Sequence, residues 1–291
     1  MAATAIHGAG IRRTKARKKT IHRLLIVLSI VLGLAMAFPL YWLLRGSFVS
    51  HAEILARPPV FFPSAFSIEN FSKAIDRIDF SRQLWNSVSI VVPYVVFNVI
   101  TTSFAGYAFA KLRFPLRGMW FGLVISTMML PSAVTLVPQY SLFTSLGLAG
   151  KPALIIPAIF CAGGNAYFVF LLRQFFMTIP DELLEAAKID GAGYFRIYLK
   201  IMLPLIRPAL IVVALFSFIN NWNDFFYTMI YLKKEADYTL PMGLYIVNGM
   251  RIPNYEQVMA LALIVTAPCL AFFFIGNKYF VEGITLTGIK G

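Results

Sequence analysis

A short run of polar side chains interrupts an otherwise apolar part of the sequence. The run contains three amides, one indole and one carboxylate, in the order Asn220, Asn221, Trp222, Asn223 and Asp224. Amides and carboxylates hydrogen-bond hydroxyl groups, and an indole offers a flat face against which a pyranose ring can stack. Polar groups inside a membrane span usually face a cavity or another helix, because they are costly in lipid. These residues are candidates for contact with a polyhydroxylated substrate, and the alternative is an unwound segment that acts as a gate.

A second candidate site lies in the apolar run 119–143. Pro131 and Pro138 interrupt this run, and Gln139 and Tyr140 follow the second proline directly. Each proline leaves a carbonyl without its helical donor, and that carbonyl needs another partner in a dry environment. Broken helices often border transport pathways. We therefore expect Gln139 and Tyr140 beside a pathway, and the alternative is a kink that neighbouring helices satisfy.

Residues suited to catalysis or metal binding are few. His7, His22 and His51 lie outside the apolar runs, whereas Cys161 and Cys269 lie within them with no second thiol or histidine at ligand spacing. The sequence shows no paired acids and no nucleophile beside a base. This pattern disfavours a membrane enzyme, and we expect no catalytic residue, no metal site and no cofactor bound by the chain.

The composition is that of a membrane protein. Of the 291 residues, 59% are hydrophobic and 13% are charged, whereas about 25% of the residues in a soluble domain are charged. A helix of about 20 apolar residues crosses the hydrocarbon core of a bilayer. The sequence predicts an all-α integral membrane protein with six transmembrane helices, at residues 24–44, 86–110, 119–143, 153–172, 205–232 and 258–280.

The basic residues set the expected orientation. Residues 1–23 form a basic arm with seven Lys and Arg, which should keep this end in the cytoplasm and either be disordered or lie on anionic membrane lipid. With this orientation, 17 of the 26 Lys and Arg fall on the cytoplasmic side. The net charge of +13 therefore indicates membrane topology. We expect no nucleic-acid partner. Residues 24–291 then form one transmembrane domain with both termini cytoplasmic. The outer segment 45–85 either caps the helices or docks a soluble partner.

The cytoplasmic segment 178–204, between the fourth and fifth spans, carries helix-start and helix-stop signals. Thr178 can cap a helix that has Pro180 in its first turn and Asp181 at the capping-box position, and Gly191 can end it. A second stretch with apolar residues at helical spacing follows. The segment predicts a thin helix-turn-helix on the inner face of the membrane, and the alternative is an ordinary interfacial loop.

The spacing of particular residues in this segment resembles a known family. Glu185-Ala186-Ala187, then Gly191, then Ile201-Met202-Leu203-Pro204 resembles the coupling loop of binding-protein-dependent ATP-binding-cassette permeases. Three further stretches resemble the carbohydrate-uptake subfamily of these permeases, and the last of them resembles the tail of the shorter permease of the maltose-type pair: residues 131–147, 221–225 and 283–291.

The resemblance implies a function for the helix-turn-helix. It implies that the loop docks into a separate ATPase subunit through Glu185, Ala186, Ala187, Gly191, Ile201, Leu203 and Pro204, and that the tail residues Gly288, Lys290 and Gly291 reach the same partner. ATP and Mg²⁺ would lie on the partner, because this chain has no Gly-x4-Gly-Lys-Ser/Thr phosphate loop.

The resemblance also implies an assembly. It consists of a second related permease in a heterodimer, two ATPase subunits and a periplasmic or surface solute-binding protein, placed in a bacterial inner membrane and importing a sugar or oligosaccharide. A stand-alone secondary transporter of a polar solute is the alternative. Such a transporter would also have broken, polar spans, but it would not need a coupling loop.

Overall fold

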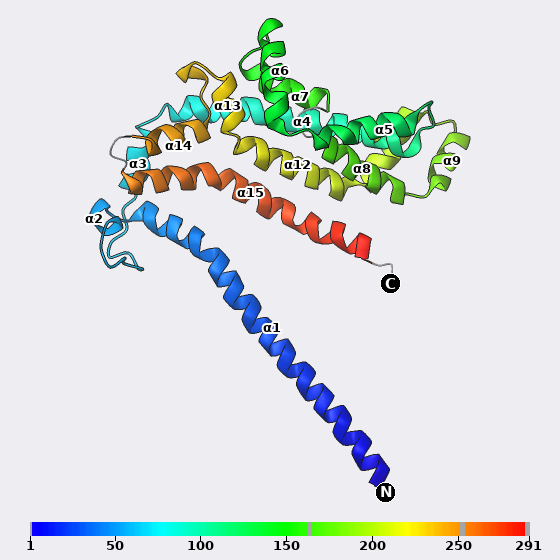
Figure 1. Cartoon of the computed structure of the whole chain (residues 1–291), viewed down its shortest axis with the longest axis horizontal. Coiled ribbons are helices and arrows are strands. Elements are labelled where there is room, and N and C mark those ends of the chain that lie inside the picture. The colour runs from blue at the N-terminus through cyan, green and yellow to red at the C-terminus, as the bar shows by residue number, and fades with distance from the viewer. Residues whose placement is uncertain (1, 162–164, 251–253, 289–291) are drawn as a thin grey trace. The chain divides into compact units, whose positions relative to one another are not determined.

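The computed structural model describes residues 2–161, 165–250 and 254–288, with side chains described within 21–161, 165–250 and 254–277. Every regular element in these ranges is a helix (Figure 1), so the predicted all-α class is confirmed. The main helices are α1 (Ala2–Phe48), α2 (His51–Ile54), α3 (Glu69–Ile75), α4 (Phe80–Lys111), α5 (Arg117–Ser126), α6 (Ser132–Ser145), α7 (Lys151–Ile159), α8 (Ala166–Thr178), α9 (Asp181–Ile189), α10 (Tyr194–Ile197), α11 (Leu203–Leu205), α12 (Arg207–Trp222), α13 (Phe226–Tyr231), α14 (Leu240–Asn248) and α15 (Tyr255–Gly288). Three short elements complete the set: the 3₁₀ turns η1 (Thr127–Met129) and η3 (Glu235–Asp237) and the π-helical turn η2 (Tyr198–Met202).

Several helices are long and apolar enough to cross a membrane. Three do so singly, over Ile21–Phe48, Phe80–Lys111 and Tyr255–Asn277. Two bent pairs also qualify by length and composition, Arg117–Met129 with Ser132–Ser145 at 103° and Tyr194–Leu205 with Arg207–Trp222 at 81°. The predicted fourth span, 153–172, falls on the separate helices α7 and α8. The count of six spans therefore stays a prediction.

Two predicted segments differ from the helices of the structure. The backbone of α1 is helical from Ala2 onward, so the basic arm and the first span form one continuous helix. The predicted fifth span, 205–232, is broken, because α12 ends at Trp222 and α13 begins at Phe226. Of the polar run, Asn220, Asn221 and Trp222 stay helical, whereas Asn223 and Asp224 lie in the break.

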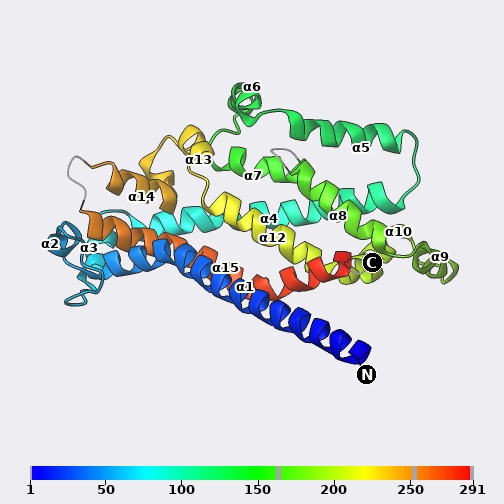
Figure 2. The same cartoon turned by 60° about the horizontal axis from the view of Figure 1, so that its bottom comes forward.

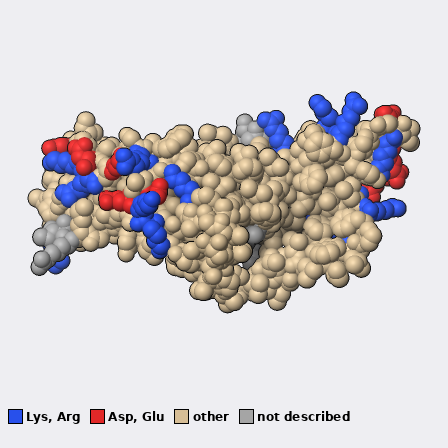
Figure 3. All heavy atoms as spheres, turned by 90° about the horizontal axis from the view of Figure 1, so that it is seen from above, with Lys and Arg blue, Asp and Glu red and all other residues tan. Residues whose placement is uncertain are grey.

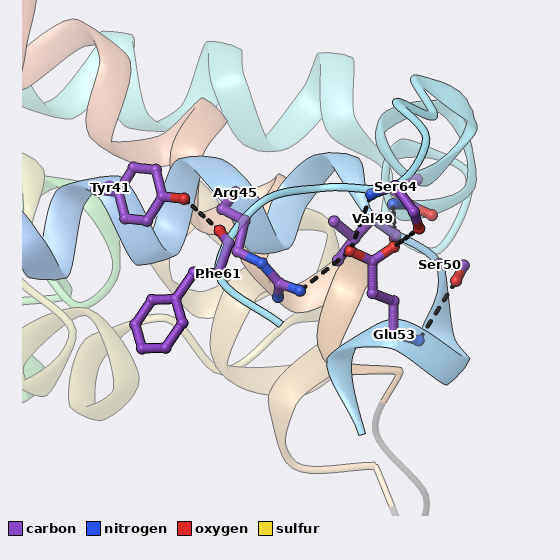
Figure 4. Close-up of polar contacts among 8 residues, drawn as sticks. Tyr41, Arg45, Val49, Ser50, Glu53, Phe61 and Ser64 are labelled. Carbon is purple, nitrogen blue, oxygen red and sulfur yellow. Dashed lines mark hydrogen bonds and ion pairs between the residues drawn. The ribbon is translucent and has the colours of Figure 1, made fainter. Parts of the chain in front are cut away.

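The chain divides into two compact units, which are described separately. Unit 1 contains Met1–Lys73 and Asn254–Leu263. Within it, the segment after α2 is held by the carboxylate of Glu53, which accepts from the buried Arg45 at 3.2 Å and from the Ser64 hydroxyl at 2.7 Å (Figure 4). Residues 45–64 of this unit are thus connected by hydrogen bonds through Glu53.

Unit 2 contains Ala74–Pro253 and Ile264–Gly291 and is built around α4. Helix α4 begins at the N-cap Asp79, whose Oδ1 accepts from the Arg82 amide at 3.3 Å, and it packs against α7, α8 and α12. Gly106 allows a close approach to α8, because a Cβ atom there would lie 3.1 Å from both Leu172 Cβ and the Arg173 amide nitrogen. Charged side chains gather mainly towards the two ends of the face in Figure 3 and leave a broad band between them, as expected for helices that cross lipid.

Candidate transport cavity and coupling helix

A cavity of about 1130 Å³ lies within unit 2. Its walls come from α4, from the bent pair α5 and α6, from α7 and α8, and from α12 and α13. Small-molecule sites usually occupy about 300–1,000 Å³. The cavity is therefore large enough for a ligand of oligosaccharide size.

Amides, hydroxyls and one carboxylate line this cavity. Four residues that the sequence placed near a pathway belong to its wall: Gln139, Asn220, Asn221 and Asp224. The Asp224 Oδ1 atom also accepts from the Tyr227 amide at 3.1 Å, and so caps α13 directly after the break in the fifth predicted span. The break therefore places a carboxylate in the cavity wall.

Two further polar groups of the wall have unused donors. The Tyr94 hydroxyl donates to Asn165 Oδ1 at 3.0 Å, but Asn165 Nδ2 has no hydrogen-bond partner among the described residues. The hydroxyl of Tyr231 is likewise buried without a partner in this part of the chain. Both atoms are buried away from solvent, so they belong to the packing behind the cavity wall.

Three other predicted pathway residues lie elsewhere. The Trp222 ring is 3% exposed, stacks on Phe218 at 5.3 Å and donates through Nε1 to the Val265 carbonyl at 2.9 Å, so neither face is offered to the cavity. Asn223 bonds back to the Ile219 carbonyl at 2.8 Å. Tyr140 packs against Tyr231 at 5.6 Å, outside the wall itself. Because the Trp222 ring is buried, it does not fit the expectation that a sugar ring stacks on it.

Replacing Trp222 tests its structural role. Trp222→Phe keeps an aromatic ring against Phe218 but removes the Nε1 donor to Val265, so we expect the free energy of unfolding to fall by about 1 kcal/mol. A thermal unfolding series in detergent would measure a decrease in Tm of about 2–4 °C. Trp85→Phe is the matched control, because Trp85 is 67% exposed and should change Tm little. Equal Tm values for the two variants would contradict the role given to Trp222.

The predicted helix-turn-helix is present as α9 and the helical segment that begins at α10. Helix α9 lies at one end of unit 2, beyond α8 and α10 (Figure 2). Its start differs from the expected capping box, because Pro180 occupies the N-cap and Thr178 ends α8 with its hydroxyl on the Phe175 carbonyl at 2.8 Å. Asp181 is the first helical residue, a position at which the helix dipole stabilises a negative charge.

The end of α9 has the stop that the sequence predicts. Gly191 has φ +77°, the left-handed conformation that glycine adopts easily. The amide of Gly191 donates to the Lys188 carbonyl at 3.0 Å, and the amide of Ala192 donates to the Ala187 carbonyl at 2.9 Å. These two bonds form a Schellman motif. The chain therefore reverses its direction within a few residues, and the end of α9 keeps a narrow profile.

The two faces of α9 have different environments. Leu184 and Ala187 are buried in a core cluster with residues of α8 and of the segment after α10. Glu185 and Ala186 are exposed on the opposite side, as is Gly191 at the end. Ala187 therefore serves the packing of α9, and the surface available for docking is formed by Glu185, Ala186 and their exposed neighbours.

The remaining predicted coupling residues follow the turn. Ile201 and Leu203 are partly buried against the same core cluster, and Pro204 is exposed. Gly288 is the last residue of α15, and Lys290 and Gly291 lie outside the described residues. The structure thus brings Ile201 and Leu203 to the base of α9 as packing residues.

Some residues of both regions were missed by the sequence reasoning. In the cavity wall they are Tyr94, Tyr227 and Tyr231, whose phenol tips within apolar spans were the available signal. At α9 it is Ile189, which is 86% exposed at the last turn.

An all-helical chain with apolar spans, a cavity lined by polar groups and an exposed helix between two of these spans is typical of a membrane transport protein. Residues 98–285 match the family described as "Binding-protein-dependent transport system inner membrane component". The chain therefore belongs to this family, and the predicted resemblance is confirmed. It is a multi-pass inner-membrane permease and not a catalytic enzyme.

Relatives with assigned names cover nearly the whole chain. The arabinooligosaccharides transport system permease protein AraQ of Halalkalibacterium halodurans is 32% identical over 258 residues, which cover 87% of this chain and 91% of the relative. The sn-glycerol-3-phosphate transport system permease protein UgpE of Rhizobium meliloti is 29% identical over 281 residues, covering 93% and 98%. A chain from a bacterial ABC transporter involved in the import of the acidic polysaccharide alginate has a TM-score of 0.76 at 24% identity, covering 88% and 95%, and shows the same fold.

Proposed function

We propose that this chain is the permease subunit that forms half of the pathway for a sugar or oligosaccharide in an ABC importer. The family is that of a binding-protein-dependent transport component, and named relatives transport arabinooligosaccharides and alpha-glucosides. The cavity wall supports a polyhydroxylated substrate, because it combines amides, phenols and a carboxylate. These groups are suited to hydroxyls, which both donate and accept.

The observation that carries the coupling part of the proposal is the build of α9. A short helix is fixed from below by Leu184 and Ala187, presents Glu185 and Ala186 outward, and ends in the tight turn at Gly191. Such a helix can enter a cleft of another subunit and transfer force to the core beneath it. We assign its partner as an ATPase subunit that holds ATP and Mg²⁺.

The assembly follows from this assignment. Two ATPase subunits bind the coupling helices of this chain and of a second, related permease, and the two permeases form a heterodimer around the pathway. A periplasmic or surface solute-binding protein delivers the sugar. The basic arm and the C-terminal end of α15 lie on the cytoplasmic side with α9, and the tail residues Gly288, Lys290 and Gly291 are second candidates for ATPase contact.

Reconstitution separates this function from its alternative. The chain is placed in proteoliposomes with a second permease, an ATPase and a solute-binding protein from the same organism. Uptake of labelled arabinooligosaccharides, alpha-glucosides and acidic oligosaccharides is then measured. We expect uptake of one of these classes only when all components and internal ATP are present, and none when the ATPase is omitted. Uptake by this chain alone, driven by an ion gradient, would instead identify a secondary transporter. Membership in the binding-protein-dependent family favours the importer.

A further inference from the structure

A buried lysine at the end of α4 holds the start of the coupling helix. Lys111 is the last residue of α4, and its side chain is 4% exposed. The ammonium group donates to the Ile179 carbonyl at 2.6 Å and forms an ion pair with the Asp181 carboxylate. A buried lysine needs such partners, because an unpaired charge is costly to remove from water. Both partners belong to the turn that leads from α8 into α9.

The charge on this pair is maintained at neutral pH. The hydrogen bond and the positive charge of Lys111 lower the pKa of Asp181 below its ordinary value. A lowered pKa in the folded protein means that the pair stabilises the fold above the ordinary pKa of the carboxyl and loses this effect only as the pH falls through the lowered value. The contact therefore persists across the physiological range.

Two more residues on the same face of α4 hold the other side of the turn. Tyr107 donates to the Tyr194 carbonyl at 3.2 Å, and the Ser103 hydroxyl lies 2.7 Å from the Tyr198 hydroxyl. Ser103, Tyr107 and Lys111 are spaced four residues apart, which places them in one row along a helix. This row, the α4 stripe, contacts the chain both before α9 and after it.

We propose that Lys111 is a positioning residue that ties the coupling helix to α4, so that a displacement of α9 passes directly to α4. The inference rests on the proposed coupling to an ATPase. Because α4 also forms a wall of the cavity, the stripe connects the docking surface to the pathway through a single helix. Lys111 contacts neither the substrate nor the surface of α9 that is offered to a partner.

The first test measures the position of α9 in the chain itself. The variants are Lys111→Met, which keeps the apolar stem and removes the charge, and Lys111→Arg, which keeps the charge. In lipid nanodiscs, Lys111→Met is expected to raise amide hydrogen exchange over 181–190 by about tenfold, while Lys111→Arg stays near the wild type. Lys73→Met is the matched control, because its ion pair with Glu69 is exposed and lies on α3. Unchanged exchange over 181–190 in Lys111→Met would overturn the proposal.

The second test measures coupling in the complete importer. We expect Lys111→Met to lower the sugar transported per ATP hydrolysed by about tenfold while the ATPase still copurifies with the permeases, and Lys111→Arg to restore most of this ratio. If Lys111→Met transported as much sugar per ATP hydrolysed as the wild type, Lys111 would have no role in transmission, whether or not amide exchange over 181–190 is faster. Failure of the wild-type chain to bind any ATPase would instead contradict the proposed function.

A further variant covers the case in which Lys111→Met does not reach the membrane. Asp181→Asn changes an exposed side chain and leaves Lys111 its bond to the Ile179 carbonyl. We expect Asp181→Asn to lower the sugar transported per ATP hydrolysed by only about threefold, because the bond from Lys111 to the Ile179 carbonyl remains. A ratio equal to that of the wild type in this variant would count against the ion pair as part of the connection.

Discussion

Gly191→Val is expected to abolish uptake while leaving the protein in the membrane. Gly191 has φ +77°, and a β-branched residue is strained in this conformation by about 1–2 kcal/mol or more. A Cβ atom at this position would meet nothing within 4 Å, so the substitution disturbs the turn without crowding the core. The expected consequence is a coupling helix with a misplaced end. Uptake in cells and the amount of permease in the membrane, measured by immunoblot, check this result.

Two controls separate conformation from side-chain bulk. Gly191→Asn should retain much of the uptake, because asparagine enters the left-handed region more readily than other residues. Gly193→Val places the same bulk two residues later, where φ is −70° and no atom lies within 4 Å of a new Cβ. This variant should also transport. Normal uptake by Gly191→Val would remove the support for docking through this turn.

Asp224→Ala is the second change with a large expected effect. The substitution removes both the carboxylate in the cavity wall and the cap on the Tyr227 amide. A hydrogen bond to a charged group contributes about 1.5–3 kcal/mol, so we expect kcat/KM for sugar uptake to fall by about tenfold or more. Asp224→Asn keeps an oxygen for the cap and loses the charge. Initial uptake rates over a range of sugar concentrations measure both variants.

A matched cap variant shows whether the effect comes from the cavity. Asp79 also caps a helix, with its Oδ1 on the Arg82 amide at 3.3 Å, but it does not belong to the cavity wall. Asp79→Ala should cost a similar capping energy of about 1 kcal/mol with little change in kcat/KM. If Asp224→Ala and Asp79→Ala lowered uptake equally, Asp224 would be a structural cap and not a contact for substrate.

The polar segment 220–224 shows how far sequence reasoning reaches in a membrane helix. The sequence predicts a pathway segment, and Asn220, Asn221 and Asp224 line the cavity. It did not separate these from Trp222 and Asn223, because consecutive helical residues point about 100° apart and the orientation depends on neighbouring helices. Trp222 is turned towards Phe218, one helical turn earlier, and towards Val265, which lies 43 residues away in the sequence. Contact of Asn220, Asn221 and Asp224 with substrate stays a prediction.

The coupling segment shows a similar limit. The spacing from Glu185 to Pro204 predicted the family, which the comparison with known proteins confirms. The left-handed turn at Gly191 was also predictable, because it depends on local chemistry. The ion pair between Asp181 and Lys111 was not predictable. Lys111 lies 70 residues earlier, at the predicted cytoplasmic end of the second span, where no motif distinguishes it. Docking of the segment and the count of six spans stay predictions.

The contact at Gly106 has a consequence for how α4 moves. Most helix pairs are separated by side chains that can change rotamer and absorb a small shift. Here the α4 backbone carries no Cβ of its own, and an added carbon would lie 3.1 Å from both the Leu172 Cβ and the Arg173 amide nitrogen. Close contacts of this kind depend on small residues and favour tight backbone packing. We therefore expect a displacement of α4 at this crossing to carry α8 with it.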